Sequence, residues 1–257
     1  MSYNGSLVKY YDKIFSQKKY SNEVKYISDV CKKYLPNKVN NILDFGCGTG
    51  THSILLANDL KTKITGYDLS PDMIRCANEK KFDHNLCYFT SDKNHILNQT
   101  DEFDLTISMF YVVNHLVTYE NLNDFLKICS IKTKKDGLLI FDCWNGVAAL
   151  RDPPYSSTKE RFSNDGTKIV TDCYSKTDLL NCNVNMTNNV KVFKNKKIID
   201  SFTYNLEHTL WTPFILKQTL EKNGFETVLI NKTYDINSQA NHKDYKISFV
   251  CINRGIK

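Results

Sequence analysis

A glycine cluster directly after an apolar segment constrains the fold of this chain more than any other feature. Residues 41–45, Asn-Ile-Leu-Asp-Phe, predict a buried strand, and glycines follow at positions 46, 48 and 50. A helical pattern starts at about residue 53, so the glycines occupy a turn between a strand and a helix. Glycine permits left-handed backbone in such a turn and lets a ligand approach the main chain closely. We therefore expect a ligand site there, since open α/β sheets bind ligands at the carboxyl ends of their strands.

Strands and helices alternate through the first half of the chain. Further apolar strands are expected at residues 63–68, 86–90, 103–110 and 137–142, with helical patterns between several of them. One helix is expected to start with Ser70 as its N-cap and Pro71 in its first turn. Near-continuous apolar strands are typical of a parallel sheet buried on both faces. The sequence predicts a Rossmann-like α/β fold, mostly parallel, with helices on both faces.

The pattern changes after residue 151, where Arg-Asp-Pro-Pro breaks the alternation. Residues 169–206 show a period of two, which predicts an antiparallel β insertion before the last helix. One face is expected to hold Val184, Met186, Val190 and Val192, and after a basic turn at 194–197 another holds Ile198, Phe202, Tyr204 and Leu206. We divide the chain into an N-terminal helical segment covering the ligand site (1–40), a binding core (41–150), the insertion on the substrate side (151–210) and the end of the core (211–257).

Composition excludes several classes of protein. The chain has 257 residues, 41% of them hydrophobic, and a net charge of +6, which argues against disorder and gives no strong basic stripe for a nucleic acid. Nine cysteines occur without a C-x-x-C pair, which favours reduced, buried thiols over a zinc site. The cysteine spacing leads us to expect no metal. We expect no membrane segment and a cytoplasmic location, because the chain shows no apolar leader or spanning stretch.

Two aspartates extend the glycine motif. Asp68 ends the second expected strand and Asp92 follows the third, so both carboxylates fall at the edge that holds the glycine turn. A carboxylate at the end of the second strand suits the two hydroxyls of a ribose, and Asp92 could accept from an adenine amino group. The alternative for each is a helix cap. A dinucleotide fingerprint would place a glycine at position 51, where this chain has threonine.

These motifs resemble those of class I S-adenosylmethionine-dependent methyltransferases. The resemblance rests on Leu-Asp-Phe-Gly-Cys-Gly-Thr-Gly (43–50), Gly-Tyr-Asp-Leu-Ser-Pro-Asp-Met-Ile (66–74) and Ser-Met-Phe (108–110), and it spans nearly the whole chain. It implies S-adenosyl-L-methionine as cofactor. The cofactor-binding residues that it implies are Tyr11, Tyr20, Gly46, Cys47, Gly48, Gly50, Asp68, Leu69, Met73, Asp92 and Met109.

A narrower resemblance is to N,N-dimethyltransferases that act on nucleotide-linked amino sugars. It rests on the tyrosines at positions 3, 11 and 20 and on Ser-Met-Phe followed by His115 and Leu116. In that group the N-terminal segment covers the cofactor and an antiparallel insertion receives the substrate. The resemblance implies His115 and Tyr3 as catalytic residues. On sequence alone, His115 is as well explained as a histidine bonded to backbone at the start of a helix.

Four functions remain open. The first is methylation, on nitrogen or oxygen, of a small acceptor such as a nucleotide-linked amino sugar or a surface-glycan precursor. The second is O-methylation of a capsular or phosphorus-containing precursor, and the third is RNA or protein methylation. The fourth is a protein that only binds the cofactor. The exposed hairpin could pair with that of a second copy, so the sequence leaves a homodimer open.

Overall fold

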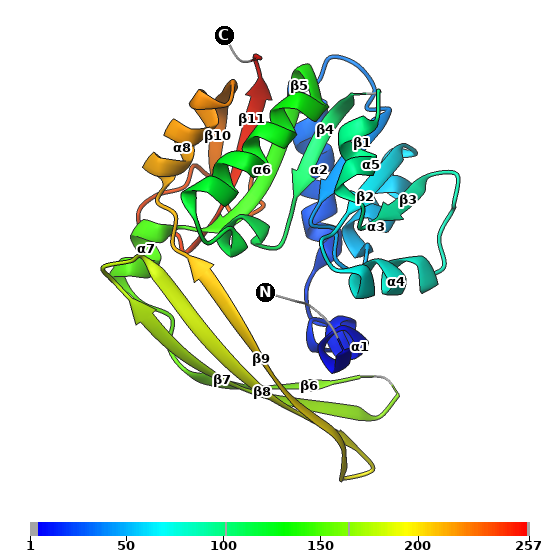
Figure 1. Cartoon of the computed structure of the whole chain (residues 1–257), viewed down its shortest axis with the longest axis vertical. Coiled ribbons are helices and arrows are strands. Elements are labelled where there is room, and N and C mark those ends of the chain that lie inside the picture. Colours follow the sequence, from blue (N-terminus) through cyan, green and yellow to red (C-terminus); the bar gives the residue numbers. More distant parts are fainter. Residues whose placement is uncertain (1–4, 101, 164, 256–257) are drawn as a thin grey trace.

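The computed structural model describes residues 5–100, 102–163 and 165–255, so the predicted catalytic residue Tyr3 lies outside the described part of the chain. Two sheets organise these residues: a larger one flanked by helices, and a smaller one that projects from it (Figure 1). The architecture is the predicted one, a mostly parallel Rossmann-like sheet with an antiparallel insertion before the last helix. Within the described ranges, no helix is long and apolar enough to cross a membrane.

The larger sheet has the spatial order β10-β11-β5-β4-β1-β2-β3. Its strands are β1 (Asn41–Phe45), β2 (Lys63–Tyr67), β3 (Cys87–Thr90), β4 (Phe103–Ser108), β5 (Thr133–Trp144), β10 (Phe225–Lys232) and β11 (Lys246–Asn253). Strands β1 to β5 run parallel to one another, whereas β11 pairs antiparallel with β5 and with β10. The strand order reverses between β1 and β4, and open sheets of this kind bind ligands at such a switch point.

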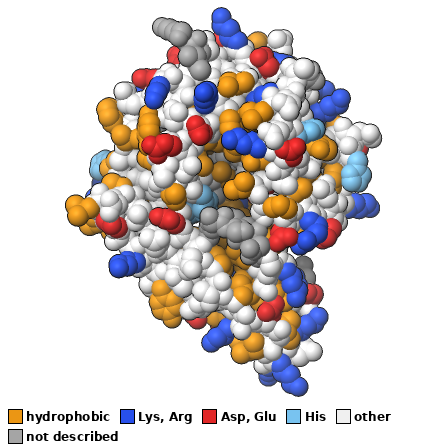
Figure 2. Space-filling model, in the orientation of Figure 1, with side chains coloured by type: hydrophobic (Ala, Val, Ile, Leu, Met, Phe, Trp, Pro, Cys, Tyr) orange, Lys and Arg blue, Asp and Glu red, His pale blue; other side chains and the backbone are white. Residues whose placement is uncertain are grey.

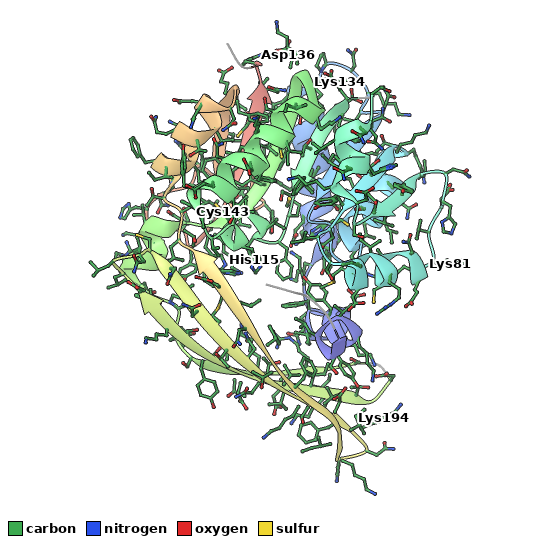
Figure 3. All side chains as sticks on the ribbon, viewed as in Figure 1. Lys81, His115, Lys134, Asp136, Cys143 and Lys194 are labelled. Carbon is green, nitrogen blue, oxygen red and sulfur yellow. The ribbon has the colours of Figure 1, made fainter. Side chains whose placement is uncertain are left out.

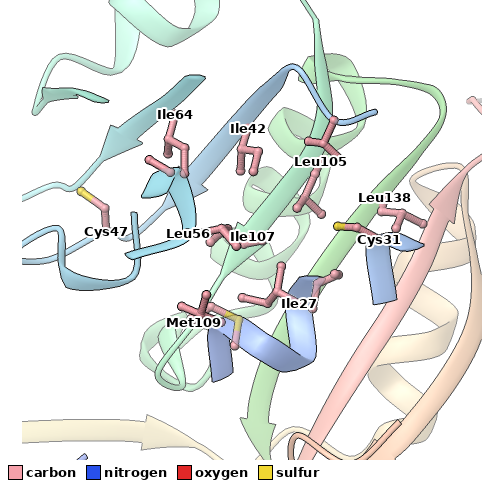
Figure 4. Close-up of a cluster of buried hydrophobic side chains, with 14 of the residues drawn as sticks. Ile27, Cys31, Ile42, Cys47, Leu56, Ile64, Leu105, Ile107, Met109 and Leu138 are labelled. Atoms are coloured by element: carbon pink, nitrogen blue, oxygen red, sulfur yellow. The ribbon is translucent and has the colours of Figure 1, made fainter. Parts of the chain in front are cut away.

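Helices cover both faces of this sheet. One face is covered by α2 (Tyr20–Tyr34), α3 (Thr51–Leu60) and α4 (Pro71–Glu79), and the other by α5 (Lys93–Asn98), α6 (Tyr119–Lys132) and α8 (Pro213–Lys222). Strand β5 shows why both faces are apolar. Its Leu138 and Ile140 pack on the α2 side and its Leu139 and Phe141 on the α6 side, because successive side chains of a strand point to opposite faces. Figure 4 shows the first of these cores, which includes Ile27 of α2 and Ile107 of β4.

Local sequence sets the ends of these helices. The Ser70 hydroxyl accepts the N–H of Met73, and Pro71 stands in the first turn, which confirms the predicted start of α4. Thr212 caps α8 in the same way, through the N–H of Ile215. Helix α5 was not expected from the sequence. It is only six residues long, too short for a helical period to be recognised, and it begins at the Asp92 cap.

The smaller sheet is antiparallel, with the order β6-β7-β8-β9. It comprises β6 (Ser157–Phe162), β7 (Thr167–Asp178), β8 (Asn183–Lys194) and β9 (Lys197–Thr209). The predicted hairpin is present, and Asn195 and Lys196 form its turn with positive φ angles of 50° and 63°. Figure 2 shows basic side chains gathered at this tip, at the lower end of the view. As predicted, Val184, Met186, Val190 and Val192 are buried together on one face of β8.

The prediction that Ile198 shares a face of β9 with Phe202, Tyr204 and Leu206 is wrong. A bulge interrupts the pairing, because Phe193 lies opposite Ile198 while Val192 lies opposite Asp200. The extra residue shifts the alternation by one, which puts Ile198 on the opposite face from Phe202. Ile198 is accordingly 56% exposed. A period of two read from sequence cannot reveal a bulge, which depends on the pairing between two strands.

The first helix, α1 (Gly5–Ile14), joins the two sheets. Its Leu7, Tyr10 and Ile14 pack against Ile169 of β7 and Val190 of β8. On its other side it contacts α4, which belongs to the larger layer. In Figure 1, α1 lies between the smaller sheet and the carboxyl edge of the larger one. The remaining short elements are η1 (Val112–His115), between β4 and α6, and α7 (Gly146–Arg151), which follows β5.

Candidate functional site

The glycine turn after β1 is built from left-handed residues. Gly46, Gly48 and Gly50 have φ angles of +84°, +55° and +72°, a region that side chains other than glycine rarely adopt. The N–H groups of Gly46 and Cys47 both donate to the carbonyl of Tyr67, at 2.7 and 3.0 Å. The turn is thereby fixed to the end of β2.

The three glycines differ in what surrounds them. A Cβ on Gly46 would lie 2.7 Å from a methyl of Val112, and one on Gly50 would lie 2.7 Å from the ring of Phe89. A Cβ on Gly48 would meet no protein atom within 4 Å. Gly46 and Gly50 are therefore required by packing as well as by φ. Gly48 instead faces open space at the cavity, where a ligand can approach the main chain.

Asp68 directly follows β2 and lies at the same edge of the sheet as the glycine turn. Its Oδ2 accepts the N–H of Gly48 at 2.8 Å, and its Oδ1 accepts the N–H of Ser70 at 2.9 Å. Burial raises the pKa of Asp68, and these two hydrogen bonds oppose the rise. The carboxylate is held in one orientation at the mouth of the glycine turn, with lone pairs remaining for further donors.

A cavity of about 700 Å³ opens at this edge. That volume lies within the range of sites for small molecules and cofactors. Ten of the residues predicted from sequence line it: Tyr11, Tyr20, Gly46, Cys47, Gly48, Asp68, Leu69, Met73, Met109 and His115. Gly50 and Asp92 are not part of the lining. Among the described side chains, no group of three His, Cys, Asp or Glu is placed to hold a metal ion.

Asp92 is the N-cap of α5. Its Oδ1 accepts the N–H of Asn94 at 2.9 Å, and the side chain is exposed. The structure therefore contains the cap that the sequence offered as an alternative. Its neighbour Lys93 lines the cavity, so Asp92 lies beside the rim. The contact with an adenine amino group stays a prediction.

A polar cluster joins the N-terminal helix to the glycine turn, and sequence analysis did not anticipate it. The ammonium of Lys80 contacts Asp12 at 2.8 Å and donates to Thr49 at 2.9 Å and to Thr51 at 2.7 Å. Thr49 also donates to Asp12, at 2.7 Å. These residues are separated by as many as 68 positions, so no spacing in the sequence relates them. The cluster holds α1, and with it Tyr11, over the cavity.

The second predicted tyrosine, Tyr20, packs edge-on against His52 with ring centroids 4.8 Å apart. His52 is bonded in turn to Glu23 at 2.6 Å, and Glu23 also pairs with Lys18. Burial raises the pKa of Glu23, but the bonds from His52 and Lys18 outweigh it, so the pKa lies below its usual value. The start of α2 is thereby fixed beside the cavity.

His115 ends η1 and lies at the edge of the sheet that faces the smaller sheet (Figure 3). Its Nε2 lies 3.2 Å from Nε2 of His208 on β9, and the rings meet edge to face with centroids 4.3 Å apart. Burial lowers the pKa of His115 to about 4 and that of His208 well below its usual value. Both imidazoles are therefore neutral near neutral pH.

The backbone between β4 and η1 is held in an unusual form. Phe110 and Tyr111 have φ angles of +71° and +64°, which cost free energy in residues with a side chain. The N–H of Tyr111 donates to Asp142 at 2.9 Å, and the hydroxyl of Tyr234 donates to the other oxygen of Asp142 at 2.5 Å. Asp142 thus stabilises the turn that carries Met109 and His115. Strain at a ligand site is a recurring feature of functional turns.

Trp144, the last residue of β5, packs edge-on against His208 and Tyr245, with centroid distances of 4.8 and 5.5 Å. It is not among the cavity-lining residues. The structure thus places it behind His208 rather than at the cavity surface.

Comparisons with known proteins relate this chain to methyltransferases. A model of the family described as methyltransferase domain matches residues 42–137. A putative methyltransferase of Geobacillus sp. (strain WCH70) is 28% identical over 138 residues, which cover 53% of this chain and 56% of that protein. The match thus spans about half the length of that relative.

Two solved structures share the fold over nearly the whole chain. An S-adenosylmethionine-dependent methyltransferase from Clostridium acetobutylicum ATCC 824 has a TM-score of 0.79 at 18% identity, covering 96% of this chain and 97% of its own. The sugar N-methyltransferase KedS8 from Streptoalloteichus sp. ATCC 53650 has a TM-score of 0.76 at 16% identity, covering 98% and 93%. Residues 42–137 thus match a methyltransferase domain, and nearly the whole chain shares its fold with these two structures.

Proposed function

We propose that this protein transfers a methyl group from S-adenosylmethionine to a small acceptor, a nucleotide-linked amino sugar or a related surface-glycan precursor. The observation that carries the proposal is the cavity at the carboxyl edge of the sheet, where Asp68 and Gly48 meet. Support for the acceptor comes from the sugar N-methyltransferase with the same overall fold, smaller sheet included.

The residues at the cavity fit S-adenosylmethionine. Gly48 leaves open the space that a Cβ would take, which suits a ligand lying against the main chain. The carboxylate of Asp68 suits the two ribose hydroxyls. In this proposal Leu69 and Met73 flank the adenine, and Gly46, Cys47 and Met109 border the methionine part. Tyr11 and Tyr20 close the site from the N-terminal side.

When bound, S-adenosylmethionine supplies a methyl group already activated by its sulfonium. The chain then has to orient the acceptor and exclude water. Helix α1 and the start of α2 exclude water by covering the cavity. The Lys80 cluster holds α1 in place there. The neutral His115 forms part of the wall and adds no positive charge beside the sulfonium. Asp142 fixes the turn that carries Met109 and His115.

Other acceptors are less well supported. Basic side chains at the hairpin tip, residues 194–197, lie at the far end of the smaller sheet from His115 (Figure 3). A nucleic acid or protein acceptor would favour a basic surface around the cavity itself. O-methylation of a capsular or phosphorus-containing precursor is the second candidate, and a cofactor-binding protein without transfer is the third. We further propose a cytoplasmic enzyme, since all nine cysteines are free thiols.

A labelled methyl donor tests this function. The protein is incubated with S-adenosylmethionine carrying a deuterated methyl group and with a panel of nucleotide-linked sugars, amino sugars included. Mass spectrometry with fragmentation then locates the label. We expect a labelled amino sugar. Cofactor binding without any labelled product would contradict the proposed acceptor, and absence of cofactor binding would contradict the methyltransferase proposal itself.

A further inference from the structure

The imidazoles of His115 and His208 meet through the same ring atom. Their Nε2 atoms are 3.2 Å apart, a hydrogen-bond distance, although the two residues are 93 positions apart in the chain. Two N–H groups cannot face each other, and neither can two lone pairs. One Nε2 therefore carries the proton and the other accepts it.

The surroundings of His208 indicate which ring donates. His208 is 4% exposed, and its Nδ1 is buried without a hydrogen-bond partner among the described residues. A proton on that Nδ1 would be a buried donor without an acceptor, whereas a proton on Nε2 has His115 to receive it. For His115, the backbone of Glu207 raises the pKa against the effect of burial, which favours a proton on that ring. Both observations are met if His208 carries its proton on Nε2 and His115 on Nδ1.

We propose that His208 is a positioning residue that donates its Nε2–H to Nε2 of His115, so that the lone pair of His115 is engaged and His115 does not act as a general base. This inference rests on the proposed function for its consequence at the acceptor. A hydroxyl acceptor needs a base, whereas a neutral amine attacks with its own lone pair. With no base in this pair, the site favours an amine nitrogen as the acceptor atom.

The reaction balances without a base in this pair. The nitrogen lone pair forms the new bond to the methyl carbon, and the carbon–sulfur bond breaks with its electrons passing to sulfur. The methylated nitrogen then releases its proton to water.

Among the described residues, few titratable groups face the pair. From the packed elements these are His115 on η1 and His208 on β9, with Tyr245 and Tyr111 one ring further away across Trp144. Burial raises the pKa of Tyr245 to about 12 and also raises that of Tyr111, so both phenols stay neutral. The pair therefore keeps one arrangement of protons through the neutral range.

Imidazole nitrogen NMR tests this directly, on full-length protein with ¹⁵N-labelled histidine and S-adenosylhomocysteine. Signals are assigned by loss in His115→Asn and His208→Phe. We expect His115 protonated on Nδ1 and His208 on Nε2, with neither titrating between pH 5 and 8. A proton on Nε2 of His115, or titration of either ring in that range, would overturn the inference. The measurement needs no acceptor, so its result is independent of whether the proposed substrate class is correct.

Substitutions separate positioning from simple packing. In His208→Phe, Nε2 of His115 loses its donor, so we expect the nitrogen shifts of His115 to change and its pKa to rise. His208→Gln can place an amide N–H near the same point and should restore the Nδ1 proton on His115. His242→Gln, an exposed histidine away from the cavity, should change neither. Unchanged His115 shifts in His208→Phe would contradict the inference, as would a labelled methyl found on a hydroxyl in the transfer assay.

Discussion

The carboxylate of Asp68 accepts the backbone N–H of Gly48 at 2.8 Å, which ties the end of β2 to the one glycine of the turn whose missing side chain leaves open space. The second carboxylate oxygen is bonded to Ser70. This relationship places a partly buried anion and an accessible main chain side by side. A ligand that uses one of them lies within reach of the other, so substitutions at the two positions test the site in different ways.

Asp68→Ala should remove cofactor affinity. The substitution deletes the proposed acceptor for two ribose hydroxyls, each worth about 1.5 kcal/mol, so S-adenosylhomocysteine should bind roughly 100-fold more weakly. Isothermal titration calorimetry measures this, with circular dichroism to establish that the fold persists. Asp136→Asn, in a surface ion pair with Arg254, serves as the matched control. Equal affinity in Asp68→Ala and the native chain would refute the role of Asp68.

Alanine at Gly48 and at Gly50 should have opposite consequences. Both have positive φ, which costs an alanine about 1–2 kcal/mol. At Gly50 the new Cβ also meets Phe89, so overpacking adds about 1–3 kcal/mol to the loss in the free energy of unfolding. Gly48→Ala should lose less stability but bind S-adenosylhomocysteine at least roughly 10-fold more weakly, about 1.4 kcal/mol.

Urea unfolding and calorimetry, run on both variants, separate the two effects. Gly166→Ala is the control, because it has the same sign of φ, open surroundings and no part in the cavity. It should lose stability as Gly48→Ala does and keep full affinity. If Gly48→Ala also binds normally, the cofactor does not lie against this glycine.

The predicted contact of Asp92 with adenine can be tested while the N-cap of α5 is kept. Asparagine is as good an N-cap as aspartate, so Asp92→Asn should keep α5 intact, whereas Asp92→Ala should cost about 1 kcal/mol of stability. If the carboxylate also accepts from adenine, both variants should bind S-adenosylhomocysteine about 10-fold more weakly. Calorimetry beside thermal unfolding gives both quantities. Normal affinity in Asp92→Asn would leave Asp92 as a helix cap alone.

The buried Asp44 should impose a pH dependence on stability. Burial raises its pKa to about 6, although the Ser53 hydroxyl donates to it at 2.5 Å. The folded state therefore holds a proton between about pH 4 and pH 6 that the unfolded chain, with a pKa near 3.9, has released. The contribution of Asp44 to stability falls as pH rises through this window, by about 3 kcal/mol in total.

Asp44→Asn should remove that fall. The free energy of unfolding of the variant minus that of the native chain should increase by about 2 kcal/mol between pH 4 and pH 7. Urea titrations across this range give the difference. Asp136→Asn should differ from the native chain by less than about 1 kcal/mol throughout. A pH-independent difference for Asp44→Asn would show that Asp44 keeps an ordinary pKa in the fold.

The sequence predicted those parts of the site that depend on neighbours along the chain. The glycine turn follows an apolar strand, Ser70 and Pro71 start a helix, and ten of the predicted residues line one cavity. Each of these rests on local propensity and on the rule that parallel strands end at one edge. The missed features have no such local signal. The Lys80–Asp12 pair, the β9 bulge that turned Ile198 outward and the partnership of His115 with His208 join distant segments.

The sequence by itself determined the architecture of the larger sheet and the position of the ligand site, with its glycines and carboxylate, at the edge of that sheet. It could do so because a strand, a turn and a helix are each encoded by adjacent residues. Only the tertiary structure decided the state of the chemical groups. His115 could be read as a base or as a structural histidine until β9 brought His208 to 3.2 Å from it. Burial and hydrogen bonding between distant elements set protonation and tautomer, and neither is a property of a residue's neighbours in sequence.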